Sequence, residues 1–415
     1  MNLIEQTRQQ ADALFNQLGL PSKRDEHWKY TDVSAWADAL QAEPTSSNIK
    51  AENLGIADLD VYRLVFINGV FDGTSSNLPH DIDILPMSEF LSTHEGQALE
   101  AYARLFDVQA DAPLMNGFEA YNAAHATDGA AVCLAANSKL DKPLYILHIN
   151  NQNNIVRHGF ILGEHAEAEI IEHFIGTDAQ RGLSNMASHI ILQDGAQLQH
   201  YRLQQESSKQ AHIARVDVKQ HQHSTYTLHA VELGGALSRV DVLVNLAEQG
   251  ASCALHGLFV LSGRQHVDHH TRVDHTAPHC TSNETYRTVL DGRSHAVFNG
   301  KIMVHKDAIK TDSSMSNGNI LLSKHAEIDT KPELEIYNDD VLCAHGATVG
   351  QLDDKQLFYM RSRGISQEAA QELLTFAFAD EVLAAMNNDV VRRYVEQAAF
   401  AKLPHNEDIE GMLTT

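Results

Sequence analysis

A cysteine and a histidine stand one residue apart near the C-terminal end of this chain, at Cys343 and His345. If this stretch is a β-strand, residues i and i+2 project from the same face, so the two side chains lie side by side. A thiolate and a neutral imidazole suit soft or borderline metals such as iron and zinc. A metal ion or cluster usually takes about four ligands, so this pair is half of a site. The alternative is a structural pair, a buried cysteine and a hydrogen-bonded histidine.

A second group of possible ligands lies at residues 266–275, in a chain with 25 histidines. The side chains concerned are His266, Asp268, His269, His270, Asp274 and His275. A β-fold metalloenzyme would use such a cluster with a carboxylate further along the chain. In a strand, however, His266, Asp268 and His270 face one side and His269 faces the other. A histidine-rich metalloenzyme with its site around 266–275 therefore stays open as the alternative function.

Other catalytic motifs are absent from the sequence. There is no Walker A pattern and no GxSxG, so we expect a chain that is not an enzyme and does not bind nucleotide itself. The four cysteines, Cys133, Cys253, Cys280 and Cys343, form no CxxC. Neither a disulfide framework nor a structural zinc knuckle is therefore indicated, and a reducing, cytoplasmic compartment fits best.

The charge balance narrows the possible partners. There are 31 basic and 55 acidic residues among 415, a formal net charge of −24. Nucleic acids and anionic membrane surfaces select for basic patches, so neither is expected as a partner. The N-terminus lacks the basic and apolar segments of a signal peptide, and no apolar run is long enough for an ordinary transmembrane helix.

The elements that must position these residues change in type along the chain. Residues 2–18 carry a helical apolar stripe that ends at Gly19. From about residue 141 to 357, short apolar or alternating runs alternate with turn residues such as Asp194–Gly195, Gly250–Ala251 and Asn299–Gly300. So many strands without helices fit a sandwich, a barrel or a parallel β-helix.

Small residues supply a possible β-helix repeat. Ala308, Ala326 and Ala347 are 18 and 21 residues apart, which we take as about one turn of such a helix. After Gly364 the pattern is helical again, with Ser366 as a plausible N-cap and a second helix starting near Asn388. These helices either cover the β core or form a docking surface for a partner.

Three long motifs resemble the SufB/SufD family of scaffold proteins from the SUF iron–sulfur cluster assembly system. They are TKPELEIYNDDVLCAHGATVGQLDDKQLFYMRSRGI (330–365), the segment 268–323, and RDEHWKYTDVSAW (24–36). The last resembles an E-x-W-K-Y-T element typical of the SufD branch, which the modest length and the scarcity of cysteines also favour. The resemblance covers essentially the whole chain.

The resemblance implies a mainly β protein, with a right-handed parallel β-helix core flanked by N-terminal and C-terminal helical regions. We therefore expect an N-terminal helical or mixed region at 1–140, the β-helix at 141–360 and a C-terminal helical domain at 361–415. Family members of the SufD branch pair with SufB through the ends of their β-helices. Each also binds the ATPase SufC through its C-terminal helices.

For the site, the resemblance implies that His345 and Cys343 are ligands of a transient iron–sulfur cluster shared with SufB. His345 is the stronger candidate, and Cys343 is either a second ligand or a redox-sensitive neighbour. Asp339, Asp340 and a turn at Gly346–Gly350 are expected to hold the strand end in shape. The isolated chain would bind no cofactor tightly, and it could form a homodimer through the same end when SufB is absent.

Overall fold

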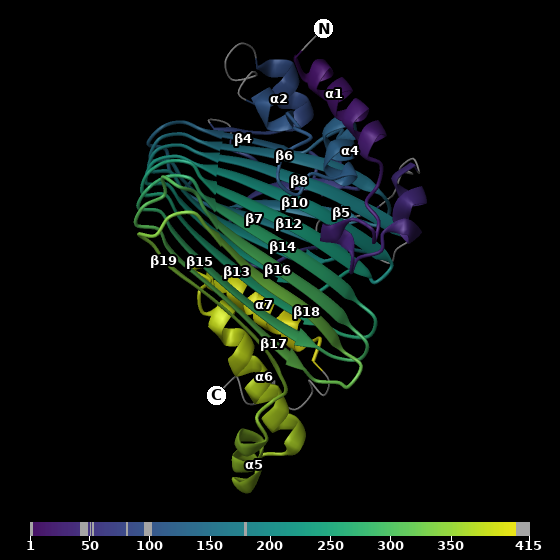
Figure 1. Ribbon diagram of the computed structural model, residues 1–415. Coiled ribbons are helices and arrows are strands. Elements are labelled where there is room, and N and C mark those ends of the chain that lie inside the picture. Colours follow the sequence, from purple (N-terminus) through teal and green to yellow (C-terminus); the bar gives the residue numbers. More distant parts are fainter. Residues whose placement is uncertain are drawn as a thin grey trace.

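A computed structural model describes residues 3–41, 49, 51, 54–79, 82–94, 102–177 and 181–403. Its core consists of two facing sheets whose strands alternate along the chain, so that each strand pairs with the next but one (Figure 1). From β5 onward all these pairings are parallel. The core is therefore a parallel β-helix, and the predicted fold class is confirmed.

The first sheet has ten strands in the order β19-β17-β15-β13-β11-β9-β7-β5-β1-β2. Its strands are β1 (Tyr62–Ile67), β2 (Val70–Phe71), β5 (Leu144–Asn150), β7 (Glu167–Gly176), β9 (Gln197–Gln205), β11 (Thr225–Glu232), β13 (Ser252–Leu261), β15 (Thr281–Leu290), β17 (Asp312–Leu321) and β19 (Leu342–Gly350). The second sheet has nine strands in the order β18-β16-β14-β12-β10-β8-β6-β4-β3. Its strands are β3 (Asp83–Pro86), β4 (Ala130–Leu134), β6 (Asn154–Leu162), β8 (Gly182–Leu192), β10 (Gln210–Gln220), β12 (Leu237–Leu246), β14 (His266–His275), β16 (His295–Val304) and β18 (Glu327–Ile336).

One coil of the β-helix is longer than the alanine spacing suggested. Residues paired in register on successive coils are 26 to 32 apart, as in Leu144 with Ile170 and His295 with Glu327. The predicted period of 18 and 21 residues is wrong, because Ala308 and Ala326 lie at different corners of the coil and Ala347 lies within β19.

The true repeat is a two-residue corner ahead of each strand of the first sheet from β7 to β17. The first residue has a positive φ, and the second is small and buried. These pairs are His165–Ala166, Gly195–Ala196, His223–Ser224, Gly250–Ala251, His279–Cys280 and Lys310–Thr311. A side chain at Gly195 is disfavoured for two reasons. The φ of +67° suits glycine, and a Cβ would lie 2.2 Å from Nδ1 of His165 on the preceding coil. These corners, and not a strand pattern, mark the same place on successive coils.

The predicted turn at Asn299–Gly300 is wrong, because both residues lie inside β16. Glycine is needed there for packing and not for a turn. A Cβ on Gly300 would lie 2.5 Å from Sδ of Met315, which points into the core from the facing sheet.

Buried polar side chains share the interior of the β-helix with the apolar core. Glu172 accepts hydrogen bonds from Ser188 (2.7 Å) and from Nε of Arg202 (3.0 Å), and its Oε1 lies 3.2 Å from Nε2 of His200. Burial lowers the pKa of His158 to about 4. Much of the high histidine content is therefore structural.

The N-terminal region packs against the second sheet. Its elements are α1 (Leu3–Leu18), the 3₁₀ helices η1 (Glu26–Trp28), η2 (Ser34–Gln41) and η3 (Arg104–Phe106), and the helices α2 (Met87–Thr93) and α4 (Gly117–His125). The predicted N-terminal helix is confirmed from Leu3, and Gly19 ends it with a φ of +64°. Residue 2 lies outside the described residues.

The C-terminal helices are α5 (Asp354–Ser362), α6 (Gln367–Leu383) and α7 (Asp389–Phe400). Both predicted starts are confirmed, since the side chains of Ser366 and Asn388 accept hydrogen bonds from the first free backbone N–H groups. Helices α6 and α7 cover the outer face of the first sheet, where Val382, Val391 and Val395 are buried. Residues 404–415 of the predicted C-terminal domain lie outside the described residues. Within the part that is described, no helix combines the length and apolar character needed to cross a membrane.

Candidate functional site

Cys343 and His345 lie on β19, the outermost strand of the ten-stranded sheet. Their partners in register on β17 are Ser313 and Met315, which are both buried in the interior of the β-helix. The thiol and the imidazole therefore point toward the same, inner side of the last coil. Cys343 is half-buried against the core, whereas His345 is exposed. The predicted placement on one face of a strand is confirmed.

The last coil is open to solvent among the described residues. No described strand pairs with the outer edge of β19 or β18, so their backbone groups face away from the β-helix unpaired. Large apolar side chains are exposed beside this edge, namely Ile336 (41%), Tyr337 (58%), Leu342 (72%) and Val349 (51%). A free strand edge with exposed apolar residues is a surface suited to pairing with another chain.

The electrostatic setting of Cys343 keeps its thiol protonated without a metal. Burial raises the pKa of the thiol, and the nearby carboxylate of Asp312 raises it further. A soft metal ion would have to displace this proton in order to bind the sulfur. A thiol with a raised pKa is a weak nucleophile at neutral pH.

The turn before β19 is held by its polar residues. Asp340 forms an ion pair with Nζ of Lys310 at 2.7 Å, and its backbone N–H donates to the side chain of Asn338 at 2.9 Å. The backbone N–H of Lys310 donates to the carbonyl of Asp340 at 2.7 Å. Asp340 therefore holds the conformation of the turn that leads into β19. Gly346–Gly350 is part of β19 and not a turn, which corrects that expectation.

The stretch 266–275 forms β14 and is divided between two faces, as its pattern predicted. His266, Asp268 and His270 lie on the outer face, where Thr31 of the N-terminal segment contacts both His266 (2.8 Å) and Asp268. Arg239 pairs with Asp268 and stacks over the ring of Trp28, 4.5 Å from its centroid. These residues attach the segment around 24–36 to the second sheet.

The inward residue of this stretch has a different environment. The His269 ring packs between Phe259 and Tyr286, at centroid distances of 5.2 and 5.3 Å, and burial lowers its pKa to about 3. Groups of three or more potential metal ligands do occur among the described residues, but none of them includes a residue of 266–275. The structure thus gives this stretch a packing role and does not bring its ligands together.

The strand pattern alone does not predict the exposed edge, which is expected only from the family resemblance. The strand pattern of β18 and β19 resembles that of the buried strands before them, since Leu342, Cys343 and Val349 are ordinary strand residues. A usable signal is the helical pattern that follows Gly350 directly, because it leaves no sequence for a further coil.

Comparisons with known proteins cover almost the whole chain. The family model for the SUF system FeS cluster assembly SufBD core domain matches residues 145–378, and the SufBD protein N-terminal region matches residues 1–146. The chain is 32% identical to the iron–sulfur cluster assembly protein SufD of Escherichia coli, over 93% of this chain and 90% of that protein.

Two further relatives match over most of their length. An iron–sulfur cluster assembly SufBD family protein of Synechocystis is 34% identical over 92% of this chain and 87% of its own. A chloroplastic protein of Arabidopsis thaliana is 29% identical over 90% of this chain and 80% of its own.

Proposed function

This chain belongs to the SufB/SufD family of the SUF iron–sulfur cluster assembly system, in its SufD branch, and on that premise we propose that it is a non-enzymatic scaffold subunit. In this proposal its open β-helix end pairs with SufB, and its C-terminal helices recruit the ATPase SufC. His345 and Cys343 supply its share of a transient iron–sulfur cluster that is built between the two scaffold subunits. The observation that carries the proposal is the placement of both side chains on the uncovered last coil.

Two ligands on an open edge fit a shared cluster better than a resident one. A cluster bound within one chain would need further cysteines or histidines close by. None of the described groups of three or more potential ligands contains Cys343 or His345. The missing ligands would come from SufB, which explains why the isolated chain is expected to bind no cluster tightly.

The exposed edge supports the pairing with SufB. Antiparallel or parallel addition of a partner strand to β19 would satisfy its unpaired backbone groups and cover Leu342 and Val349. The same edge could pair with that of a second copy, so a homodimer is the expected form when SufB is absent.

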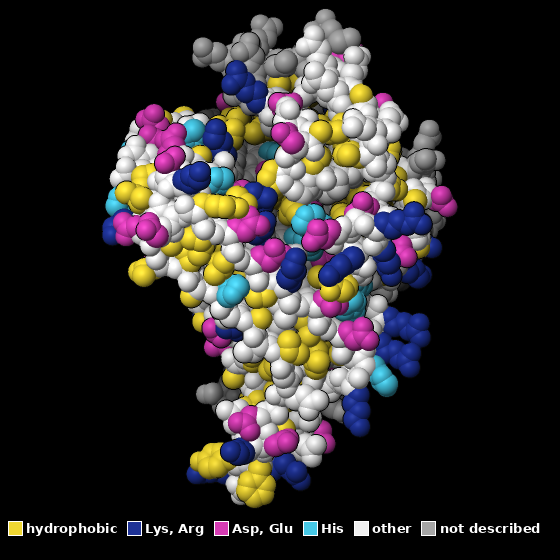
Figure 2. All heavy atoms as spheres, in the orientation of Figure 1, with side chains coloured by type: hydrophobic (Ala, Val, Ile, Leu, Met, Phe, Trp, Pro, Cys, Tyr) yellow, Lys and Arg dark blue, Asp and Glu magenta, His cyan; other side chains and the backbone are white. Residues whose placement is uncertain are grey.

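The C-terminal helices offer a separate surface for SufC. Helix α5 has no buried residue, and Phe358 and Tyr359 on it are 74% and 57% exposed. Figure 2 shows hydrophobic side chains at the tip of the molecule, which is α5 in Figure 1. Aromatic side chains left in water on a projecting helix are typical of a protein-binding surface. ATP chemistry would then come from the partner and not from this chain.

The test is anaerobic co-expression of this chain with SufB and SufC, followed by measurement of iron and sulfide per purified complex. We expect His345→Ala to leave the complex assembled but to remove most of the iron and sulfide. Cys343→Ala decides whether the thiol is a ligand, since only a ligand's loss lowers the iron content.

Thr348→Ala is the matched control, because this exposed residue of β19 lies on the opposite face from Cys343 and His345. It should assemble and load like the unmodified chain. Normal loading of both the His345 and the Cys343 variants would contradict the shared site and leave this chain only a conformational role.

A further inference from the structure

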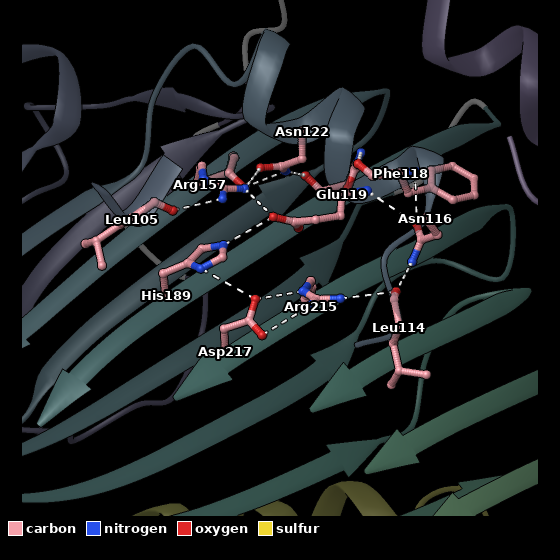
Figure 3. Close-up of polar contacts among 12 residues, drawn as sticks. Leu105, Leu114, Asn116, Phe118, Glu119, Asn122, Arg157, His189, Arg215 and Asp217 are labelled. Carbon is pink, nitrogen blue, oxygen red and sulfur yellow. Dashed lines mark hydrogen bonds and ion pairs between the residues drawn. The ribbon is translucent and has the colours of Figure 1, made fainter. Parts of the chain in front are cut away.

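A cleft on the outer face of the second sheet contains a group of ligands that the proposed function does not use. The cleft has a volume of about 350 Å³ and lies between the N-terminal region and strands β8, β10 and β12. Glu119, His189 and Asp217 line it, with one donor atom from each within 4.8 Å of the others (Figure 3). The three residues come from α4, β8 and β10, and His189 and Asp217 are paired in register.

The imidazole of His189 lies between the two carboxylates without a hydrogen bond to either. Its Nε2 is 3.4 Å from Oε1 of Glu119, and its Nδ1 is 3.5 Å from Oδ2 of Asp217. Both distances exceed the usual 2.7–3.2 Å of an N–H···O bond. Two ligand atoms of a tetrahedral metal ion with bonds of about 2.0–2.1 Å are about 3.4 Å apart. An imidazole gives a metal ion only one of its two nitrogens, so only one of these contacts could become a coordination edge. One donor atom from each of the three residues nevertheless lies within 4.8 Å of the others, a spacing that a single ion can bridge.

Glu119 has an unused acceptor at the same point. The residue is 3% exposed, and within the described part of the chain its buried Oε2 has no hydrogen-bond partner. Its Oε1 accepts a hydrogen bond from Arg157 at 2.9 Å. A buried carboxylate oxygen that lacks a hydrogen-bond donor is available to coordinate a metal ion.

The surrounding residues hold the carboxylates in place without filling the site. Arg215 binds Asp217 through two hydrogen bonds of 2.7 and 3.1 Å, and is itself anchored by the carbonyls of Pro113 and Leu114. The arginine charges offset those of the carboxylates. The affinity for a cation is therefore moderate, and the ion would exchange with solvent through the cleft.

We propose that Glu119, His189 and Asp217 form a binding site for an exchangeable divalent transition-metal ion, of the class of Zn²⁺ or Fe²⁺. One imidazole and two carboxylates suit these borderline ions, and the cleft has room for waters to complete the coordination. The ion would link helix α4 of the N-terminal region to the β-helix. This inference goes beyond the proposed function and does not depend on it.

The test uses the full chain carrying Cys343→Ala and His345→Ala, so that the open end cannot contribute ligands. Anaerobic titration with Co²⁺, followed by its visible absorption, and with Zn²⁺, followed by calorimetry, should show one equivalent bound per chain. His189→Gln and Asp217→Asn should each weaken binding at least about tenfold, as loss of a direct ligand requires.

His221→Gln is the control, because His221 belongs to the other described ligand group, with Asp194 and Glu248, on the surface. It should leave the affinity unchanged. Asp217 is partly exposed and Asn keeps its shape, so this variant should fold even if His189→Gln does not; circular dichroism checks both. The proposal is overturned if the background chain binds no stoichiometric metal, or if binding depends on His221 and not on Asp217.

Discussion

The first and last coils of the β-helix are built from similar strands but lie in opposite environments. Every residue of β5 is buried, whereas in β19 only Cys343 is even half-buried. Both strands start with leucine, but Leu144 belongs to the interior core and is fully buried, while Leu342 faces outward next to the inward-facing Cys343 and is 72% exposed. Whether a hydrophobic strand residue is buried thus depends on the elements around the strand. At the last coil, no described element covers β19.

The difference lies in what precedes and follows the repeats. Before β5, the chain adds β1 to the same sheet, and β2 then pairs with β1 in the antiparallel direction. On the other sheet β3 closes the edge against β4, again antiparallel. After β19 the chain turns directly into α5 and leaves the edge free. The first end is therefore closed by the chain itself, whereas no described strand closes the last end.

The largest expected difference between the two ends is the loss of unfolding free energy when a leucine is replaced by alanine. Leu144→Ala should lower the free energy of unfolding by about 2–5 kcal/mol, because it leaves a cavity in a packed core. Leu342→Ala should change it by less than about 0.5 kcal/mol in the isolated chain. Urea denaturation of both variants measures this. Equal losses would show that the last coil is covered in the isolated chain.

The stability cost of replacing a glycine by alanine is expected to differ less, as between Gly195 and Gly346. Gly195→Ala should cost about 1–3 kcal/mol, since φ is +67° and the new methyl group would press on His165. Gly346→Ala on β19 meets no atom within 4 Å and should be close to neutral. Denaturant midpoints of the two variants compare them. A neutral Gly195→Ala would contradict the role assigned to this corner.

The smallest effect at neutral pH is expected for His269→Phe, which keeps the ring packing between Phe259 and Tyr286. The pKa of His269 falls from its ordinary 6.5 to about 3 in the folded chain, so the unfolded chain binds its proton first. This histidine therefore costs stability as the pH falls below about 6.5 toward 3. The phenylalanine variant should gain stability relative to the unmodified chain on acidification. Thermal melts between pH 7 and 4 measure the difference, and parallel curves would refute it.

Much of the fold follows from local sequence. The helix starts at Ser366 and Asn388 were predictable because capping depends on a few neighbouring residues. The strand-rich middle was evident, but its pattern alone fitted a sandwich as well as a β-helix, and the family resemblance decided between them. The coil length was missed because its marker is a backbone conformation, shared by Gly195, His223 and Lys310, which have no common side chain.

The site was predictable only in part. The face shared by Cys343 and His345 follows from strand geometry, but their exposure depends on which coil is last. The cluster of Glu119, His189 and Asp217 has no signature in the sequence, because its members come from three separate elements. Conversely, the histidine run at 266–275 looked like a site and instead packs the N-terminal segment against the sheet.

The hydrogen bonds between coils also have a mechanical consequence. They run along the axis of the β-helix, so the rod resists stretching and bends as one piece. The C-terminal helices are joined to its side at several coils, through Asn388 with Glu169, Tyr394 with Gln205 and Glu381 with Arg287. A force applied to these helices is therefore not absorbed locally. It acts on several coils at once, and inter-strand hydrogen bonds connect these coils to the free end that carries Cys343 and His345.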